Sequence, residues 1–228
     1  MRTERDIILD SVLLLYLLDG AGEIRGNLKT QKTTFLAELA LREQGLHGPH
    51  FGFFRYKNGP FSKDLAQTYD RLVAGGFLAP ETAKPTERGQ FLLGLAFPQL
   101  REQNEAVFAS MDETLAIYRA WNGRQLMEHV YSLTVEPDGW PGMRLPVEKI
   151  PMHMDILVPP PGGLEVDNDT LALVLEELSI TQEEIEEAER DWPETEQRAI
   201  KRLTDAILAA ERSRGILPPK GPTGEHSE

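Results

Sequence analysis

The amino-acid sequence predicts a mainly α-helical protein with a small β component, in which a winged helix-turn-helix domain precedes a helical C-terminal region. Two apolar segments of helix length come first, and an aromatic run at residues 50–56 follows them. A third segment of helix length covers residues 63–74, and a short strand–turn unit covers residues 77–85. This order of elements is typical of a winged helix with an elaborated middle.

Two helices are expected before residue 50. Residues 5–19 carry apolar side chains around most of a helical circumference, which is typical of a buried helix. Residues 27–44 have one apolar side, and Lys29, Gln31 and Lys32 lie mostly on the other. The second helix is therefore predicted to be amphipathic.

The aromatic run and its turn lead into the third helix. Residues 50–56 are aromatic and partly alternate in polarity, which predicts a short strand. Asn58-Gly59-Pro60 indicates a turn, and Ser62 is a suitable cap for a helix over residues 63–74. Thr86-Glu87-Arg88-Gly89 then leads into a further short helical segment.

The second half of the chain is predicted to be helical with one irregular stretch. Spacings of three and four indicate helices over residues 99–121, 124–133 and 169–178, and a last helix that ends near residue 214. Residues 136–163 hold seven prolines and four glycines. We therefore divide the chain into five parts: a winged helix-turn-helix-like domain at 1–97, a helical extension packed on it at 98–135, an irregular Pro/Gly-rich segment at 136–168, an acidic helical region at 169–214 and a disordered tail at 215–228.

Charge is unevenly distributed along the chain. The net charge is −13; residues 1–97 hold 12 basic and 11 acidic side chains, whereas residues 98–228 hold 12 basic and 26 acidic ones. Non-specific nucleic-acid binders are usually basic, because phosphate contacts dominate their affinity. The acidic half is thus a poor DNA surface, or serves solubility alone, while the first half has room for a local basic patch.

Several classes of protein are not expected. No apolar run approaches the ~20 residues of a membrane span, and charged residues follow Met1 directly, so we expect no membrane contact and a cytoplasmic location. The absence of cysteine excludes thiol catalysis and disulfides. The chain has no dinucleotide, Walker, nucleophile-elbow or zincin motif, and His47 and His50 are separated by Gly-Pro. We therefore expect no enzyme, no cofactor and no metal.

The third helix is the candidate recognition helix. Lys63, Gln67 and Arg71 are four residues apart and share one face. Arginine pairs with guanine and glutamine with adenine in the major groove of DNA. An ordinary solvated face is the alternative interpretation.

Four further basic residues are candidates for phosphate contacts. Lys29 and Lys32 lie at the start of the second helix, where free backbone amides attract anions. Lys84 and Arg88 flank the predicted wing turn. Ordinary solvated residues are again the alternative.

The aromatic run has two interpretations as well. Such rings stack bases in proteins that bind single-stranded nucleic acid, and in a small domain they also form the core. The residues concerned are Phe51, Phe53, Phe54, Tyr56 and Phe61.

Three short motifs carry a resemblance to a known family. They are Gln31-Lys32 in the second helix, Gly59-Pro60-Phe61-Ser62 in the turn, and Gly75-Gly76-Phe77-Leu78 after the third helix. With these motifs the chain resembles the YwgA-like family of small prokaryotic winged-helix proteins, and it is more distantly similar to the Panacea-domain (SocA-like) antitoxins. The resemblance covers roughly residues 5–133 and implies a winged-helix fold.

Two functions remain open on the sequence alone. The first is that of a prokaryotic winged-helix DNA-binding regulatory protein without enzymatic activity. The alternative is a protein-interaction module, such as an antitoxin-like or phage-defence complex subunit, which the acidic second half favours. The partner would be DNA, or else a protein or a second copy that contacts helices 99–121 and 181–214.

Overall fold

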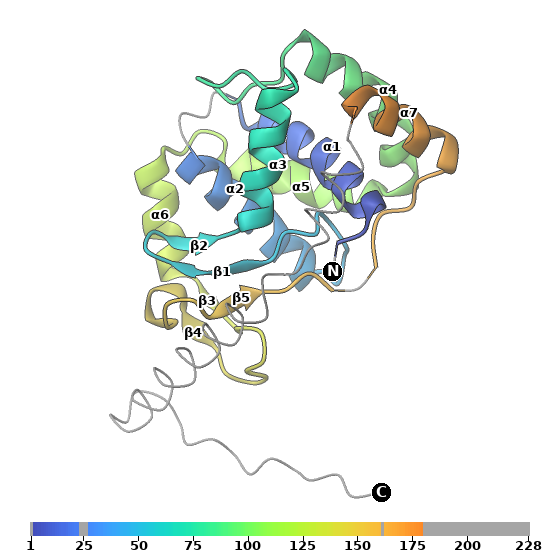
Figure 1. Ribbon diagram of the computed structural model, residues 1–228. Coiled ribbons are helices and arrows are strands. Elements are labelled where there is room, and N and C mark those ends of the chain that lie inside the picture. The colour runs from blue at the N-terminus through green and yellow to red at the C-terminus, as the bar shows by residue number, and fades with distance from the viewer. Residues whose placement is uncertain (1, 23–26, 161, 180–228) are drawn as a thin grey trace, which may run out of the picture.

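The chain is mainly helical with a small antiparallel β component, as the sequence predicts (Figure 1). A computed structural model describes residues 2–22, 27–160 and 162–179. The elements in these residues are α1 (Glu4–Ala21), α2 (Asn27–Glu43), β1 (Phe53–Tyr56), β2 (Gly59–Phe61), α3 (Lys63–Ala74), α4 (Glu87–Gln103), α5 (Glu105–Tyr118), α6 (Gly123–Ser132), β3 (Thr134–Val135), β4 (Leu145–Pro146), a 3-10 turn η1 (Val147–Lys149), β5 (Asp155–Leu157) and α7 (Asn168–Leu178).

The two N-terminal helices occupy the centre of the molecule. Thr3 caps α1 and forms a capping box with Asp6, and apolar side chains then bury almost the whole circumference of α1. In α2 every side chain from residue 30 to residue 38 is buried. The predicted amphipathic second helix is therefore wrong, because the other elements surround α2 on all sides.

A three-stranded sheet covers one side of α2. Its strand order is β2-β1-β5, and both neighbours of β1 are antiparallel to it. On the inner face, the ring of Phe53 packs edge-on against Phe35 with 5.3 Å between ring centroids. The stretch that the sequence describes as irregular thus supplies an edge strand of this sheet.

The wing-like unit after α3 is a short hairpin that is closed by one bridge and not by a longer strand ladder. A single antiparallel bridge joins Leu78 to Pro85. The backbone N–H of Ala79 donates to the carbonyl of Lys84 at 2.9 Å, and that of Thr86 donates to the carbonyl of Phe77 at 2.9 Å. A wing-like hairpin therefore fits at the place where the sequence predicts it.

The predicted helix over residues 99–121 is wrong, because α4 and α5 replace it. They meet at Asn104, whose side-chain amide donates to the carbonyls of Leu100 at 2.9 Å and Glu165 at 2.7 Å. These side-chain hydrogen bonds compete with helical backbone bonds and end α4. Helix α4 also continues through the boundary that the sequence suggests between residues 97 and 98.

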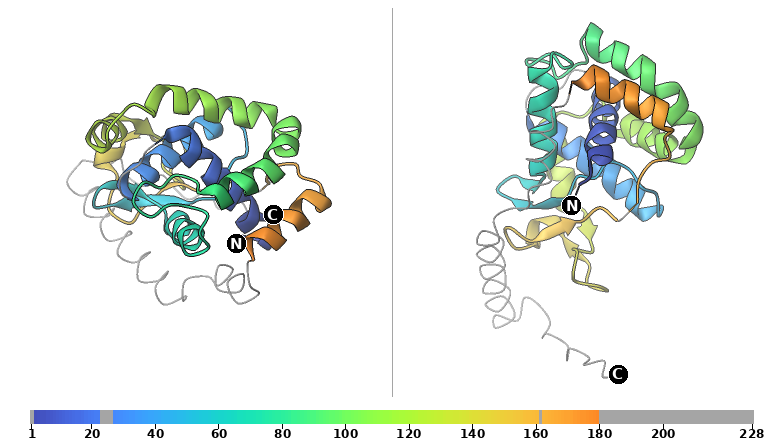
Figure 2. Two further views of the ribbon diagram at one scale, coloured as in Figure 1. Left: turned by 90° about the horizontal axis from the view of Figure 1, so that it is seen from above. Right: turned by 45° about the vertical axis from the view of Figure 1, so that its right-hand side comes forward.

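The last described helix completes the structure. Helix α7 packs against α1 and α4, as both views in Figure 2 show. One apolar core joins α1 to α7, and residues 147–178 contribute eight of its buried side chains: Val147, Ile150, Met154, Ile156, Leu157, Leu164, Val174 and Leu178. Among the described helices, none is long and apolar enough to cross a membrane.

Candidate functional site

The motifs behind the family resemblance hold one another together inside the protein. The side-chain amide of Gln31 donates to the carbonyl of Ser62 at 2.9 Å, and its oxygen accepts from the backbone N–H of Ser62 at 2.8 Å. Lys32 Nζ donates to the carbonyl of Pro60 at 2.7 Å. Gly59 has φ +92°, and a Cβ there would lie 3.3 Å from Lys32 Nζ, so glycine is required. These hydrogen bonds from Gln31 and Lys32 of α2 hold the residues just before α3 in place.

Lys32 is therefore not available for a phosphate contact. It is 2% exposed. Burial, together with the charge of Arg55, lowers the pKa of Lys32 to about 7. The expectation that Lys32 faces solvent is wrong, because its ammonium group points to the β1–β2 turn.

Lys32 should give the protein a distinctive pH dependence. Folding disfavours its protonated form, so the unfolded chain binds the extra proton between about pH 7 and pH 10.5, and stability rises with pH across this window. We expect Lys32→Met to remove a rise in unfolding free energy on the order of a few kcal/mol. Urea unfolding at several pH values measures it. Lys57→Met, on an exposed lysine, is the control and keeps the rise; parallel profiles for parent and Lys32→Met would contradict the assignment.

Helix α3 presents the predicted recognition residues beside acidic ones. Lys63 is exposed, and Gln67 and Arg71 are half-buried. Asp70 is exposed on the same outward side, since it follows Lys63 by seven residues. Burial raises the pKa of Asp64, which also lies on this helix. The two basic side chains of α3, Lys63 and Arg71, are thus accompanied by two acidic ones, Asp64 and Asp70.

The other predicted phosphate contacts differ in their surroundings. Lys84 is exposed in the wing-like turn. Lys29 Nζ donates to the carbonyl of Arg119 at 3.2 Å, and burial lowers its pKa. Arg88 bonds to Glu177 of α7 through the carboxylate at 3.0 Å and the carbonyl at 2.9 Å. Arg88 also stacks over Phe77 at 4.3 Å and therefore fastens α7 to the end of α3.

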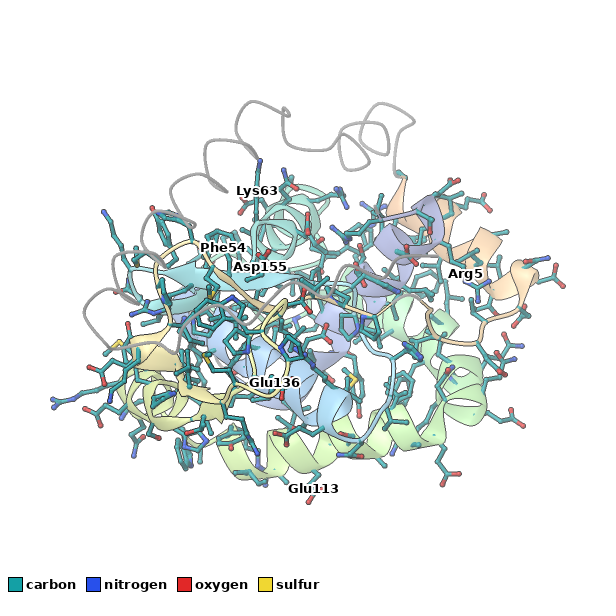
Figure 3. The ribbon with its side chains drawn as sticks, turned by 90° about the horizontal axis from the view of Figure 1, so that it is seen from below. Arg5, Phe54, Lys63, Glu113, Glu136 and Asp155 are labelled. Carbon is teal, nitrogen blue, oxygen red and sulfur yellow. The ribbon has the colours of Figure 1, made fainter. Side chains whose placement is uncertain are left out.

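The aromatic run divides between the two faces of the sheet. Phe51 and Phe53 are buried in the core. Phe54, Tyr56 and Phe61 lie on the outer face, where their rings contact one another at 5.6 to 6.1 Å. Asp155 of β5 lies opposite Phe54 in the sheet, so an acidic residue borders these rings; Figure 3 labels both residues.

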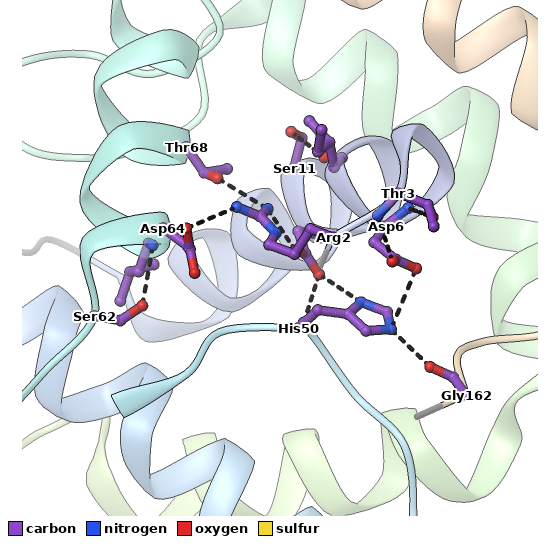
Figure 4. A network of polar contacts seen from close by, with 12 residues as sticks. Arg2, Thr3, Asp6, Ser11, His50, Ser62, Asp64, Thr68 and Gly162 are labelled. Carbon is purple, nitrogen blue, oxygen red and sulfur yellow. Dashed lines mark hydrogen bonds and ion pairs between the residues drawn. The ribbon is translucent and has the colours of Figure 1, made fainter. Parts of the chain in front are cut away.

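A buried ionic network connects the N-terminus with three other parts of the chain (Figure 4). Arg2 bonds to the fully buried carboxylate of Asp10 at 2.5 Å and lies 3.6 Å from Asp64 of α3. The other oxygen of Asp10 accepts from the backbone N–H of His50 at 2.7 Å. His50 Nδ1 lies 3.1 Å from Asp10, and its Nε2 lies 2.8 Å from the carbonyl of Gly162.

This network is structural. Burial by itself lowers the pKa of His50, but the hydrogen bond and charge of Asp10 outweigh it, and with Gly162 and Asp6 they raise that pKa. Both ring nitrogens face acceptors, which favours the doubly protonated imidazolium. The side chains of Asp10, Arg2 and His50 are 0%, 9% and 10% exposed, so they offer no open face to a ligand.

An exposed apolar ridge lies along α4 and α7. Phe91 and Leu95 of α4 are 58% and 36% exposed, and Leu173 of α7 is 52% exposed. Contacts of Thr170 with Gln99 and of Arg88 with Glu177 place α7 antiparallel beside α4. Leu173 lies about one helical turn after Thr170, and Leu95 lies about one turn before Gln99. Because Thr170 contacts Gln99 and the two helices are antiparallel, Leu95 and Leu173 lie at the same height along the two helices. We call Phe91, Leu95 and Leu173 the α4/α7 ridge.

Acidic side chains border the ridge at both ends of each helix. On α4, Glu87 precedes Phe91 by four residues and Glu102 follows Leu95 by seven. On α7, Asp169 precedes Leu173 by four residues and Glu176 follows it by three. All four carboxylates are exposed. Arg88, three residues before Phe91, is the basic residue on the α4 stripe, and its guanidinium is paired with the carboxylate of Glu177 at 3.0 Å. The ridge is therefore an apolar strip inside a mainly acidic rim, a site that the sequence pattern does not predict.

Comparisons with known proteins identify no counterpart of these sites. The chain matches no family model, no curated protein and no solved structure. Among the described residues, no group of three or more histidine, aspartate or glutamate side chains could hold a metal ion.

Proposed function

We propose that this protein is a protein-interaction module that binds a basic amphipathic helix of a partner on the α4/α7 ridge. The observation that carries the proposal is the ridge itself, because contiguous exposed apolar side chains on a folded protein mark interaction sites. A helix with an apolar stripe fits a strip between two antiparallel helices. The activity requires no catalytic group.

The charge around the ridge supports a basic partner. Surfaces of opposite charge steer two proteins together and favour the right partner, whereas surfaces of like charge repel each other. Glu87, Glu102, Asp169 and Glu176 would attract lysine and arginine on the flanks of a helix. The same carboxylates disfavour an interface between two identical ridges.

A peptide titration tests the function. The probe is a synthetic 18-residue helix with a leucine stripe and lysine flanks, and the control probe has glutamate in place of lysine. We expect saturable binding of the basic probe that weakens at high salt, because rim charges are screened. Leu95→Asp with Leu173→Asp should weaken the binding by a factor of about 10 or more, which corresponds to about 1.4 kcal/mol.

The matched control places the same charge on another exposed apolar residue. Ile117 on α5 is 50% exposed, so Ile117→Asp should leave the affinity for the probe unchanged. Equal binding of the basic probe to the parent chain and to the Leu95→Asp, Leu173→Asp variant would refute the proposal.

DNA binding is the second candidate, and the outward side of α3 favours it. Lys63, Gln67 and Arg71 follow one another along this helix, and Lys84 extends from the wing-like turn. If α3 reads DNA, Lys63→Ala with Arg71→Ala should weaken a gel shift that falls steeply with salt. The ridge variant should bind DNA as the parent does, and equal shifts by the Lys63→Ala, Arg71→Ala variant and the parent would remove this candidate.

A further inference from the structure

The chain itself contains a segment with the chemistry that the ridge requires. Residues 197–214 lie outside the described residues, and they hold five basic and two acidic side chains. Their sequence predicts a helix with an apolar stripe made of Ile200, Leu203 and Ile207, with Leu208 beside it. We propose that residues 197–214 occupy the α4/α7 ridge of the same molecule and so compete with a partner helix. This inference rests on the proposed function of the ridge.

The preceding residues have the opposite charge. Residues 180–196 hold eight acidic side chains and one basic side chain. The carboxylates of Asp169 and Glu176 would repel this negatively charged segment, so residues 180–196 would not bind the ridge. Residues 197–214 are therefore the part of the C-terminal sequence whose charge complements the rim, and residues 180–196 act as the connection.

The geometry at the end of α7 allows this return. Ser179 caps α7 in the left-handed conformation, with φ 51° and ψ 39°, and its N–H bonds to the carbonyls of Leu175 and Glu176. Such a cap turns the chain away from the helix axis. The 17 residues of 180–196 span about 25 Å even as the helix that the sequence predicts, which equals the about 25 Å length of a 17-residue helix such as α4. The segment can therefore return to Leu95 and Leu173.

The absence of native cysteine makes the docking directly measurable. In the full chain, Gly94→Cys places a thiol next to Leu95, where a Cβ meets open space. Thr204→Cys places the second thiol next to Leu203. We expect a short bismaleimide to join these two thiols within one molecule at least ten times faster than it joins Asn58→Cys to Thr204→Cys. Asn58 is exposed in the β1–β2 turn, away from α4 and α7 in Figure 1.

If docking on the ridge causes the fast cross-linking, a variant with a disrupted ridge should lose it. Adding Leu95→Asp and Leu173→Asp to the Gly94→Cys, Thr204→Cys pair should slow its cross-linking to the rate of the Asn58 pair. Equal rates for both pairs in the parent background would overturn the proposal. Predominantly cross-linked dimers would also overturn it, because the segment would then lie on a neighbouring copy.

A second measurement separates this inference from the proposed function. Leu203→Asp with Ile207→Asp should release the ridge and strengthen binding of the lysine-flanked probe at least tenfold, while Ile216→Asp with Leu217→Asp should not. If the probe binds all three chains equally, the inference fails and the function stands. If the probe binds none of them but the Gly94 pair cross-links selectively, the proposed function fails, and of the inference only the docking of residues 197–214 on the ridge stands.

Discussion

A chain that ends at residue 135 is expected to lack a cooperative thermal unfolding transition. The sequence suggests the opposite, because all the motifs of the family resemblance lie before this point. The structure places eight apolar side chains of residues 147–178 in the common core. Each is worth ~1.5–3 kcal/mol when buried, so their sum is comparable to the entire stability of a small protein, ~5–15 kcal/mol. Calorimetry or circular dichroism on heating measures the transition.

The matched control for this truncation ends after α7. A chain of residues 1–179 keeps β5, the strand that pairs with β1, and keeps the contacts of α7 with α1 and α4. It should unfold cooperatively. A sharp transition in the chain of residues 1–135 would show that the N-terminal elements form their core alone and would contradict the shared core.

Asp10→Ala is expected to lower the free energy of unfolding by about 3–5 kcal/mol, because it leaves two buried cations without their shared carboxylate. Arg2 and His50 both depend on Asp10, and its side chain is fully buried. The pKa of His50 is raised in the folded state by Asp10. That part of the stability is present below the ordinary histidine pKa and is lost as the pH rises through the raised value. The Asp10→Ala variant should not show this loss of stability as the pH rises.

An exposed ion pair supplies the comparison. Arg101 and Asp112 are 2.9 Å apart, with side chains 43% and 42% exposed. Exposed pairs contribute ~1 kcal/mol or less, and the hydrogen bond that Asp112 also accepts from the hydroxyl of Tyr16 contributes ~1 kcal/mol, so Asp112→Ala should cost less than Asp10→Ala. Guanidinium unfolding of the parent and both variants at pH 6 and pH 9 measures both effects. Equal losses for Asp10→Ala and Asp112→Ala would refute the structural role of the network.

The elements that local sequence determines could be predicted closely. The bounds of α1, α2 and α3 follow from apolar patterning and caps; Ser62 Oγ, for example, accepts from the backbone N–H of Leu65 at 3.2 Å. Helix α4 could be predicted less well, because the sequence assigns its first part to a short helical segment that follows Gly89 and its last part to a helix over residues 99–121. In the structure one helix runs from the first predicted segment into the second, with Pro98 inside it.

The long-range polar contacts could not be predicted from periodicity. Gln31 and Lys32 look like solvent-facing residues of a helix, yet their partners are backbone groups about 30 residues further on. Asp10 and His50 are 40 residues apart. Such pairs become visible only when the tertiary structure brings the segments together. For Lys32, the co-occurrence of Gln-Lys with the Gly-Pro-Phe-Ser turn was the available signal in the sequence.

Paramagnetic broadening of methyl resonances shows where on the protein the basic helix binds. The lysine-flanked probe carries a nitroxide at its middle and is titrated into the full chain with labelled leucine and valine methyl groups. The ridge predicts that Leu95 and Leu173 broaden first, while Val73 on α3 stays sharp. Broadening of Val73 with sharp Leu95 and Leu173 signals would place the interaction on α3 and contradict the account.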